Sequence, residues 1–360
     1  MTRINTDRLI STFCELVKIP SESNNEQDFI NYMEKFFKIE GAKTKKDAYG
    51  NLVARFAAKN SNSKETIGFV CHADTVKPGV GIKPIVEADR IRSSGDTILA
   101  ADDKAGIAEL IEMIRTAQKH PAVEIIITKC EEIGSFGAIN LDYSLINSKM
   151  AMVIDTEEVN QIVIGGPTLV TFDVYYKGKP SHAGVAPDKG ISSIYAASKA
   201  ISQLRLGKLD EETTANVGVI QGGEVRNGVP ENTKVMAECR CLNHEKALKL
   251  ADEMEAVFRK AAQEVGTEIK IERNMPLKAY YLPEDSDIVK LCHKALTKNG
   301  VDAKAIVLRG GSDATHINTH IPAVVLGAGY REEHSCNEYV LIKEMETITH
   351  SMVDLIEGLA

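Results

Sequence analysis

The feature that most constrains the fold is a short apolar run, IGFVC at residues 67–71, that ends at His72-Ala73-Asp74. An apolar run of this length between polar residues is typical of a buried strand. Because alternate residues of a strand point to the same side, an imidazole and a carboxylate would project together where the strand stops.

Four later stretches repeat this arrangement, with carboxylates or a histidine just after an apolar run: Asp102-Asp103, Glu131-Glu132, Asp155 and His334. In open α/β sheets, ligands bind beyond the carboxyl ends of the strands. The recurrence therefore predicts one acidic, metal-binding crevice.

The length and composition predict two folded domains in one chain. A single hydrophobic core rarely grows beyond roughly 250 to 300 residues, and this chain has 360 residues. With 43% hydrophobic and 26% charged residues, it falls among ordinary globular proteins rather than disordered ones.

The net charge of −8 argues against a nucleic-acid partner, because such partners are bound by clustered Lys and Arg. A membrane surface is disfavoured for the same reason. Charged residues interrupt the amino-terminal segment, and an apolar run of 18 residues occurs nowhere in the sequence. We therefore expect a cytoplasmic protein.

The seven cysteines are odd in number and scattered, and no Cys-x-x-Cys pair occurs. This pattern favours reduced thiols over disulfides or a zinc ribbon. A metal would then be held by imidazole and carboxylate groups, which suit zinc, manganese or cobalt in a hydrolytic site.

Apolar periodicity predicts alternating helices and strands in the first part of the chain. Thr6 is the expected cap of the first helix, and Gly41 is the expected stop of the second. The predicted helices span 6–18, 25–40 and 104–120, and the predicted strands span 51–57, 67–71, 123–128 and 151–154. Such alternation indicates a mainly parallel sheet with helices on both faces, an α/β fold.

The pattern changes after the GGP sequence at 165–167, where TLVTFDVYYKG (168–178) alternates like a half-buried antiparallel strand. The predicted elements that follow are helix 190–206, strands 214–221 and 233–242, helix 244–264 and strand 267–273. This order is that of a ferredoxin-like α+β unit.

The alternating pattern then resumes with helix 285–298, strands 305–308 and 323–326, and helix 342–359. The sequence thus predicts a discontinuous domain, 1–166 with 276–360, and an insertion, 167–275. Two connections suit the insertion to hinge closure.

Taken singly, each polar cluster has an ordinary explanation. Asp102-Asp103 could cap the helix that starts at Lys104, and Asp155 could form a turn. Together, however, the carboxylates would repel one another by about 4 kcal/mol per pair at ~4 Å and an effective dielectric near 20. Divalent metal ions are the natural counter-charge.

Eight motifs along the chain resemble those of one family, the dinuclear M20-type metallopeptidases that include peptidase T, aminoacylases and desuccinylases. They are CHADTV (71–76), ILAADDKAGIA (98–108), KCEEIGSFGA (129–138), VIDTE (153–157), KPSHAGVAP (179–187), GGEVRNGVPE (222–231), RGGSDA (309–314) and EEHSCNE (332–338). The resemblance covers nearly the whole chain and implies a zinc-exopeptidase-like catalytic domain with an inserted lid and dimerisation domain.

The resemblance implies two divalent metal ions, with zinc expected and manganese or cobalt as alternatives. One ion would be bound by His72 and Asp155, the other by Glu132 and His334, and Asp102 would bridge both. Asp74 would orient His72, and Glu131 would be the general base. Asp103 is left to helix capping.

The same resemblance places His182, Asn227 and Arg240 of the insertion at the substrate, and it implies a homodimer formed through this insertion. Gly310-Gly311 would let backbone approach the ligand closely. A nucleophilic triad of Ser312, Asp313 and His316 is disfavoured, because residues so close in sequence do not readily adopt triad geometry and a Gly-x-Ser-x-Gly elbow is missing from the sequence.

The leading functional hypothesis is an exopeptidase that acts at the free amino terminus of short peptides, similar to a tripeptide aminopeptidase. It depends on Asp at position 155, on ILAADDKAGIA and on CHADTV. An N-acyl amino acid deacylase or a carboxypeptidase is the alternative. A metal-dependent binding protein without catalysis is a third hypothesis, against which the base Glu131 argues.

Overall fold

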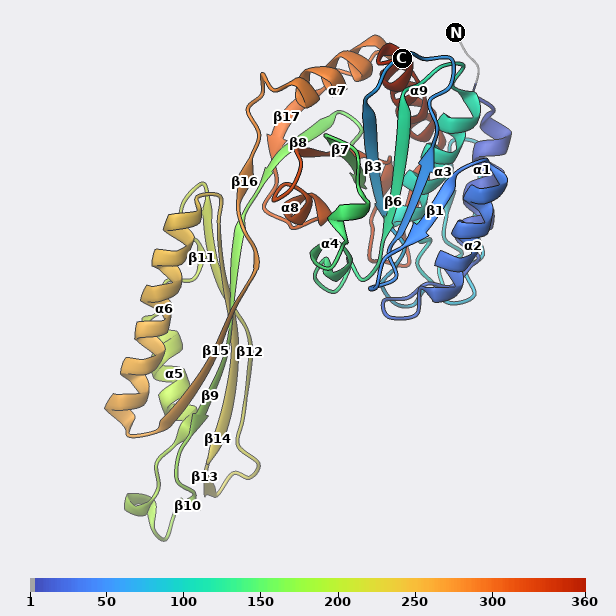
Figure 1. Cartoon of the computed structure of the whole chain (residues 1–360). Coiled ribbons are helices and arrows are strands. Elements are labelled where there is room, and N and C mark those ends of the chain that lie inside the picture. Colours follow the sequence, from blue (N-terminus) through green and yellow to red (C-terminus); the bar gives the residue numbers. More distant parts are fainter. Residues whose placement is uncertain (1–3) are drawn as a thin grey trace. The chain divides into compact units, whose positions relative to one another are not determined.

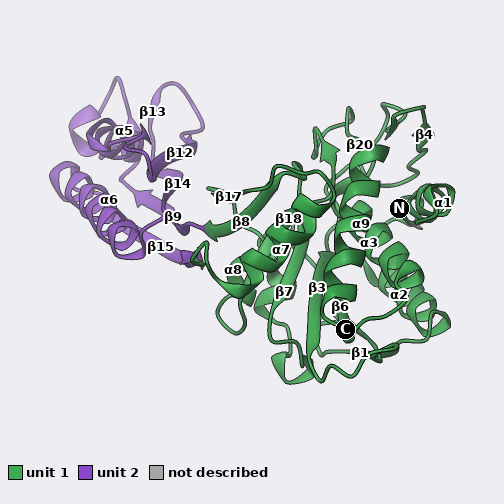
Figure 2. Cartoon of the chain, turned by 90° about the horizontal axis from the view of Figure 1, so that it is seen from above, with its two compact units in different colours: residues 1–165, 281–360 green, residues 166–280 purple. Residues whose placement is uncertain are grey.

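The computed structural model describes residues 4–360, which form two compact units. Unit 1 contains the chain up to Gly165 together with Tyr281–Ala360, and unit 2 is Gly166–Tyr280. Figure 2 shows the two units in separate colours. Each unit has its own hydrophobic core, so each is described by itself below.

Unit 1 is built on a nine-stranded sheet (Figure 1). The main order is β1 (Lys43–Lys46), β2 (Leu52–Phe56), β6 (Ala122–Thr128), β3 (Thr66–His72), β7 (Ala151–Thr156), β18 (Ala323–Gly327), β8 (Gln161–Gly166) and β16 (Tyr280–Tyr281), and β17 (Lys304–Val307) pairs with β8. The four central strands β6, β3, β7 and β18 are parallel, whereas β1 and β2 pair antiparallel to their neighbours. Strand β8 is antiparallel to β18 and parallel to β17. The predicted mainly parallel sheet is confirmed, with antiparallel edges.

Both faces of the central strands are buried, which explains why these strands read as continuous apolar runs. In β3, Phe69 and Cys71 belong to the main core, and Val70 between them is also fully buried although its side chain points to the other face. A strand covered on both sides has no polar face to alternate with. The apolar run at 67–71 therefore correctly predicted β3 as a buried strand.

The helices of unit 1 are α1 (Thr6–Leu16), α2 (Gln27–Ile39), α3 (Ala101–Thr116), α4 (Phe136–Ile139), α7 (Asp287–Lys298), α8 (Asp313–Ile317) and α9 (Ile342–Gly358). The cap of α1 is Asn5, whose side chain accepts a hydrogen bond from the Arg8 N–H, so the predicted cap Thr6 is wrong by one residue. The Thr6 hydroxyl instead donates to Glu346. Over residues 4–360, none of the helices combines the length and the apolar character needed to span a bilayer.

A small four-stranded sheet in unit 1 was not predicted. Its order is β19 (Tyr330–Arg331), β20 (Tyr339–Leu341), β5 (Arg90–Arg92) and β4 (Ile85–Val86). Strands of two or three residues are too short to show a period in the sequence. This sheet matters for the site, because it holds the loop between β19 and β20, which carries His334.

Unit 2 has the predicted ferredoxin-like order. The strands of its main sheet are β9 (Thr168–Lys177), β11 (Gly207–Lys208), β12 (Thr213–Gly222), β14 (Asn232–Cys241) and β15 (Glu268–Leu277), and its helices are α5 (Ser193–Gln203) and α6 (His244–Val265). The antiparallel sheet runs β11-β12-β14-β9-β15, and α5 and α6 pack against β9 and β14. Alternation along β9 buries Val170, Phe172, Val174 and Tyr176 against these helices.

Candidate metal centre and active site

Three elements of unit 1 bring His72, Asp102 and Asp155 together. His72 ends β3, Asp155 lies near the end of the parallel neighbour β7, and Asp102 lies in the first turn of α3. His72 Nε2 is 2.9 Å from Asp102 Oδ1 and 3.5 Å from Asp155 Oδ1. The carboxyl edge of the sheet therefore gathers these side chains as the sequence predicted.

Asp102 also contacts the second predicted histidine. Its Oδ2 lies 3.3 Å from His334 Nε2, which is in turn 2.8 Å from Glu132 Oε2. Each carboxylate oxygen of Asp102 thus faces a different imidazole. All five predicted metal ligands lie in one cluster, in which Asp102 lies between the two imidazoles.

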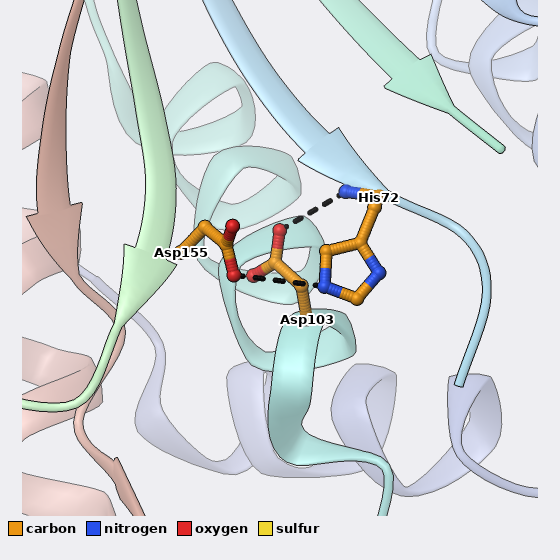
Figure 3. Close-up of side chains that lie close together, drawn as sticks. All are labelled: His72, Asp103 and Asp155. Atoms are coloured by element: carbon orange, nitrogen blue, oxygen red, sulfur yellow. Dashed lines mark hydrogen bonds and ion pairs between the residues drawn. The ribbon is translucent and has the colours of Figure 1, made fainter. Parts of the chain in front are cut away.

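Asp103 has a different place from the one predicted. The N-cap residue of α3 is Ala100, whose side chain makes no capping hydrogen bond, so the capping assignment of Asp103 is wrong. Asp103 Oδ2 instead accepts the backbone N–H of His72 at 3.1 Å. Figure 3 shows Asp103 beside His72 and Asp155, and ligand atoms of these three residues lie within 4.8 Å of one another.

Asp74 holds the segment that carries the predicted base. Its carboxylate accepts the backbone N–H groups of Glu131 at 2.8 Å and Glu132 at 3.2 Å, and the Ser23 hydroxyl at 2.8 Å. The Asp74 Oδ1 is 3.6 Å from His72 Nδ1, but the backbone oxygen of Asp74 is closer, at 2.9 Å. This carbonyl favours the tautomer with the proton on Nδ1 and directs Nε2 into the cluster.

Glu131 lies at the edge of the same cluster. Its Oε1 accepts the Ser135 hydroxyl at 3.0 Å, which fixes one carboxylate oxygen. Burial raises the pKa of Glu131 well above its usual value, and the nearby charge of Asp155 raises it further. A carboxyl group of raised pKa is suited to accept and return a proton near neutral pH.

The cluster carries more carboxylates than protein cations can neutralise. Burial raises the pKa of Asp155 to about 7, although hydrogen bonding to His72 opposes this. Hydrogen bonds to Asp102 and Glu132 raise the pKa of His334 to about 11. Both shifts arise from the crowding of carboxylates and imidazoles in the cluster, which a divalent cation would relieve.

These residues fit a divalent metal centre. Ligand atoms of His72, Asp102 and Glu132 form a second group within 4.8 Å of one another. Within residues 4–360, the Oδ1 atoms of Asp103 and Asp313 are buried without a hydrogen-bond partner. Nitrogen and oxygen donors of this kind suit zinc, manganese or cobalt.

Sequence reasoning missed two acidic residues near the site. Asp313 is buried, accepts the Thr128 hydroxyl, and has a pKa raised to about 6, chiefly by burial. Glu338 is buried and accepts four backbone N–H groups at the start of α3. Asp313 lies in the motif RGGSDA and Glu338 lies in EEHSCNE, both of which resemble motifs of the family. Membership of these motifs is the sequence feature that could have identified the two residues.

The structure places the predicted substrate residues of the insertion in unit 2. His182, in β10 (Ser181–His182), pairs with Gly228 of β13 (Gly228–Val229), and the Ala183 N–H donates to the Asn227 carbonyl at 2.9 Å. His182 and Asn227 are therefore close together, and both are exposed. Arg240 lies on β14 and pairs with Glu238, with Nε at 2.9 Å from Oε1.

The glycines of RGGSDA lie in an exposed loop between β17 and α8. A Cβ atom at Gly310 would meet open space. The disfavoured triad of Ser312, Asp313 and His316 finds no support, because Asp313 accepts the Thr128 hydroxyl and, within the described chain, His316 Nε2 is buried without a partner.

Known proteins resemble this chain over its whole length. Residues 164–266 match the M20 peptidase dimerisation domain, and residues 51–178 match peptidase family M28. The uncharacterized protein YqjE of Bacillus subtilis strain 168 is 37% identical over 99% of this chain and 100% of its own length.

Two solved structures share the fold and more than 30% of the sequence. The aminopeptidase PepT from Bacillus cereus ATCC 10987 is 36% identical, with a TM-score of 0.92 and 99% of each chain covered. A tripeptidase from Staphylococcus aureus subsp. aureus Mu50 is 33% identical, with a TM-score of 0.96 and the same coverage of 99%.

An α/β sheet that carries imidazoles and carboxylates at its carboxyl edge, with an inserted dimerisation-type domain, defines a metallohydrolase. The relatives that align over 99% of the chain identify the family within this class. The chain belongs to the peptidase T-like branch of the M20 metallopeptidase family and is a hydrolase.

Proposed function

We propose that unit 1 binds two divalent metal ions and hydrolyses the amino-terminal peptide bond of short peptides, with tripeptides as the leading substrates. The observation that carries this proposal is the position of Asp102, whose two carboxylate oxygens face His72 and His334 separately. A carboxylate shared in this way suits a two-metal site. Similarity to an aminopeptidase and to a tripeptidase supports short peptides as the substrate class.

In this proposal His72 and Asp155 would hold one ion, Glu132 and His334 would hold the other, and Asp102 would be shared by both. Zinc is the first choice, and manganese and cobalt fit the same donors. Bound ions would polarise the scissile carbonyl and lower the pKa of a water molecule.

The protein's own groups then carry the proton and keep the geometry. Glu131, held through Ser135, accepts the proton of the attacking water and returns it to the leaving amine. Asp74 keeps Glu131 and Glu132 in place through their backbone N–H groups, and its carbonyl fixes the His72 tautomer.

We also propose that the insertion, residues 167–275, serves as the lid and forms a homodimer, while 1–166 and 276–360 make up the catalytic domain. The match to the peptidase dimerisation domain supports this role. In unit 2, His182 and Asn227, adjacent on the β10–β13 pair, are proposed as substrate-binding residues. In unit 1, Gly310 and Gly311 are proposed for the same role. Arg240 would bind the substrate carboxylate, for which a planar guanidinium is suited.

A panel of three related tripeptides tests which end of the peptide is recognised. The free tripeptide should lose its first residue, and its carboxy-terminal amide should lose the same residue more slowly, because the amide lacks the carboxylate that Arg240 would bind. The N-acetylated tripeptide should react about 10²-fold more slowly or worse, because a site built for an ammonium group rejects its acylated form. Rates and products can be followed by mass spectrometry.

Two outcomes of this panel would contradict an aminopeptidase. Equal rates for the acetylated and free tripeptides would favour a deacylase. Release of the last residue of the free tripeptide instead of the first would favour a carboxypeptidase. If metal-loaded protein cleaved none of the three peptides or a broad peptide library, the proposal of an enzyme would fail.

A further inference from the structure

One buried carboxylate, that of Glu338, binds the backbone at the start of helix α3. Its Oε2 accepts the N–H groups of Leu99 at 2.7 Å and Ala100 at 2.9 Å, and its Oε1 accepts those of Ala101 at 2.7 Å and Asp102 at 3.0 Å. Only 1% of Glu338 is exposed. Four charge-assisted hydrogen bonds therefore end on one side chain.

The amino terminus of α3 needs such a partner, because its first N–H groups have no acceptor within the helix. The backbone here is also irregular. Ala100 has φ of 62°, in the left-handed region, and Asp102 and Asp103 have non-helical angles. A negative charge at a helix amino terminus is also favoured by the helix dipole. The Glu338 carboxylate thus defines the path of the backbone that carries the bridging side chain of Asp102.

Glu338 also belongs to the loop that carries His334. In this loop Glu332 and His334 have φ of 54° and 60°. The Ser335 hydroxyl donates to the Glu332 carbonyl at 2.8 Å, and the Glu338 carbonyl accepts the Ser93 N–H at 3.0 Å. One end of this short loop therefore carries His334, and Glu338 at the other end is hydrogen-bonded to the backbone at Asp102.

We propose that Glu338 is a positioning residue that sets the distance between Asp102 and His334, and so completes the second half of the metal site. This inference rests on the proposed two-metal function. In the structure the two ligand atoms lie 3.3 Å apart. Loss of the Glu338 contacts would free both segments and weaken binding at the half formed by Asp102, Glu132 and His334.

The test uses Glu338→Gln in the full chain, with Glu332→Gln as the matched control. Glutamine keeps the shape of the side chain but replaces one acceptor oxygen with an NH₂ group. This group would face two backbone N–H groups, from which it cannot accept hydrogen bonds. Glu332 lies in the same loop with an exposed side chain, so its replacement removes only a surface charge. Cobalt(II) is titrated into chelator-stripped protein, with its visible spectrum and calorimetry as readouts.

We expect Glu338→Gln to bind one cobalt ion as wild type does and the second 10 to 100 times more weakly, as is typical when groups that orient ligands are lost. The kcat should fall by a similar factor at limiting metal and recover in part with excess metal, while KM changes by less than about twofold. The control should match wild type in all respects.

The failures of the two ideas are distinguishable. If wild type bound no cobalt and cleaved no peptide, the proposed function would be wrong. If wild type bound two ions and Glu338→Gln bound both ions as tightly as wild type does, only the positioning role would be overturned. Should Glu338→Gln fail to fold, Glu338→Asp, which keeps the charge but is shorter, decides in the same assay. If neither variant folds, Glu338 is a general structural anchor and the inference fails.

Discussion

Replacing Glu131 by glutamine should lower kcat by about 10²- to 10⁴-fold, the range that general acid–base groups contribute. Glutamine keeps the length of the side chain and an oxygen that can accept the Ser135 hydroxyl, but it cannot take up a proton from water. Asp74 binds the backbone N–H of this residue, so the fold of the segment should persist. Steady-state kinetics with a tripeptide measures the effect.

The metal content separates a lost base from a lost site. Glu131→Gln should retain the wild-type number of metal ions per chain, whereas Glu132→Gln should lose metal as well as activity, because Glu132 contacts His334 within the cluster. Glu65→Gln, at an exposed glutamate, should change neither. A Glu131→Gln protein with more than half of the wild-type kcat would rule out the assigned role.

Replacing Asp102 by asparagine should have a comparable effect for a different reason. Its two oxygens lie 2.9 Å and 3.3 Å from the imidazoles of His72 and His334, and asparagine would replace one of them with an NH₂ group that cannot bind metal. Loss of a group that merely orients a ligand costs 10 to 100-fold. A bridging ligand should therefore cost more than about 100-fold in kcat/KM.

Metal analysis of Asp102→Asn should also show one ion per chain or fewer. The matched control is Asp302→Asn, since the Asp302 side chain is 94% exposed. If Asp102→Asn retained two ions and wild-type kinetics, Asp102 would not be a bridge, and the assignment of the two halves of the site would need revision.

The sequence predicted those strands whose burial leaves a clear pattern. β3 is apolar throughout because both of its faces are buried, and β9 alternates because one face packs on α5 and α6. The polar edge strand β1, with the sequence KTKK, shows neither pattern. The two- and three-residue strands around the His334 loop are too short to show any.

The site could be predicted where a residue directly follows the apolar run of a strand. His72 and Asp155 are of this kind. Asp103 was misassigned because Asp is a common helix cap, but the backbone of this turn is not helical and its side chain turns toward the His72 N–H. The role of a capping group falls to Glu338 instead.

Glu338 could not have been found from local pattern. Its four partners lie 236 to 239 residues earlier in the chain, and its position depends on pairing between β20 and β5. Propensity and periodicity describe neighbours in sequence, whereas this contact is set by tertiary structure. The motif EEHSCNE indicated only that the segment mattered.

The most direct test of the central claim is the rate of tripeptide hydrolysis as divalent metal is added back to chelator-stripped protein. If the cluster around Asp102 is a dinuclear metal centre, the stripped protein should be inactive and the rate should rise to its plateau by two equivalents of metal per chain. A rate that is already full at zero equivalents would contradict the account.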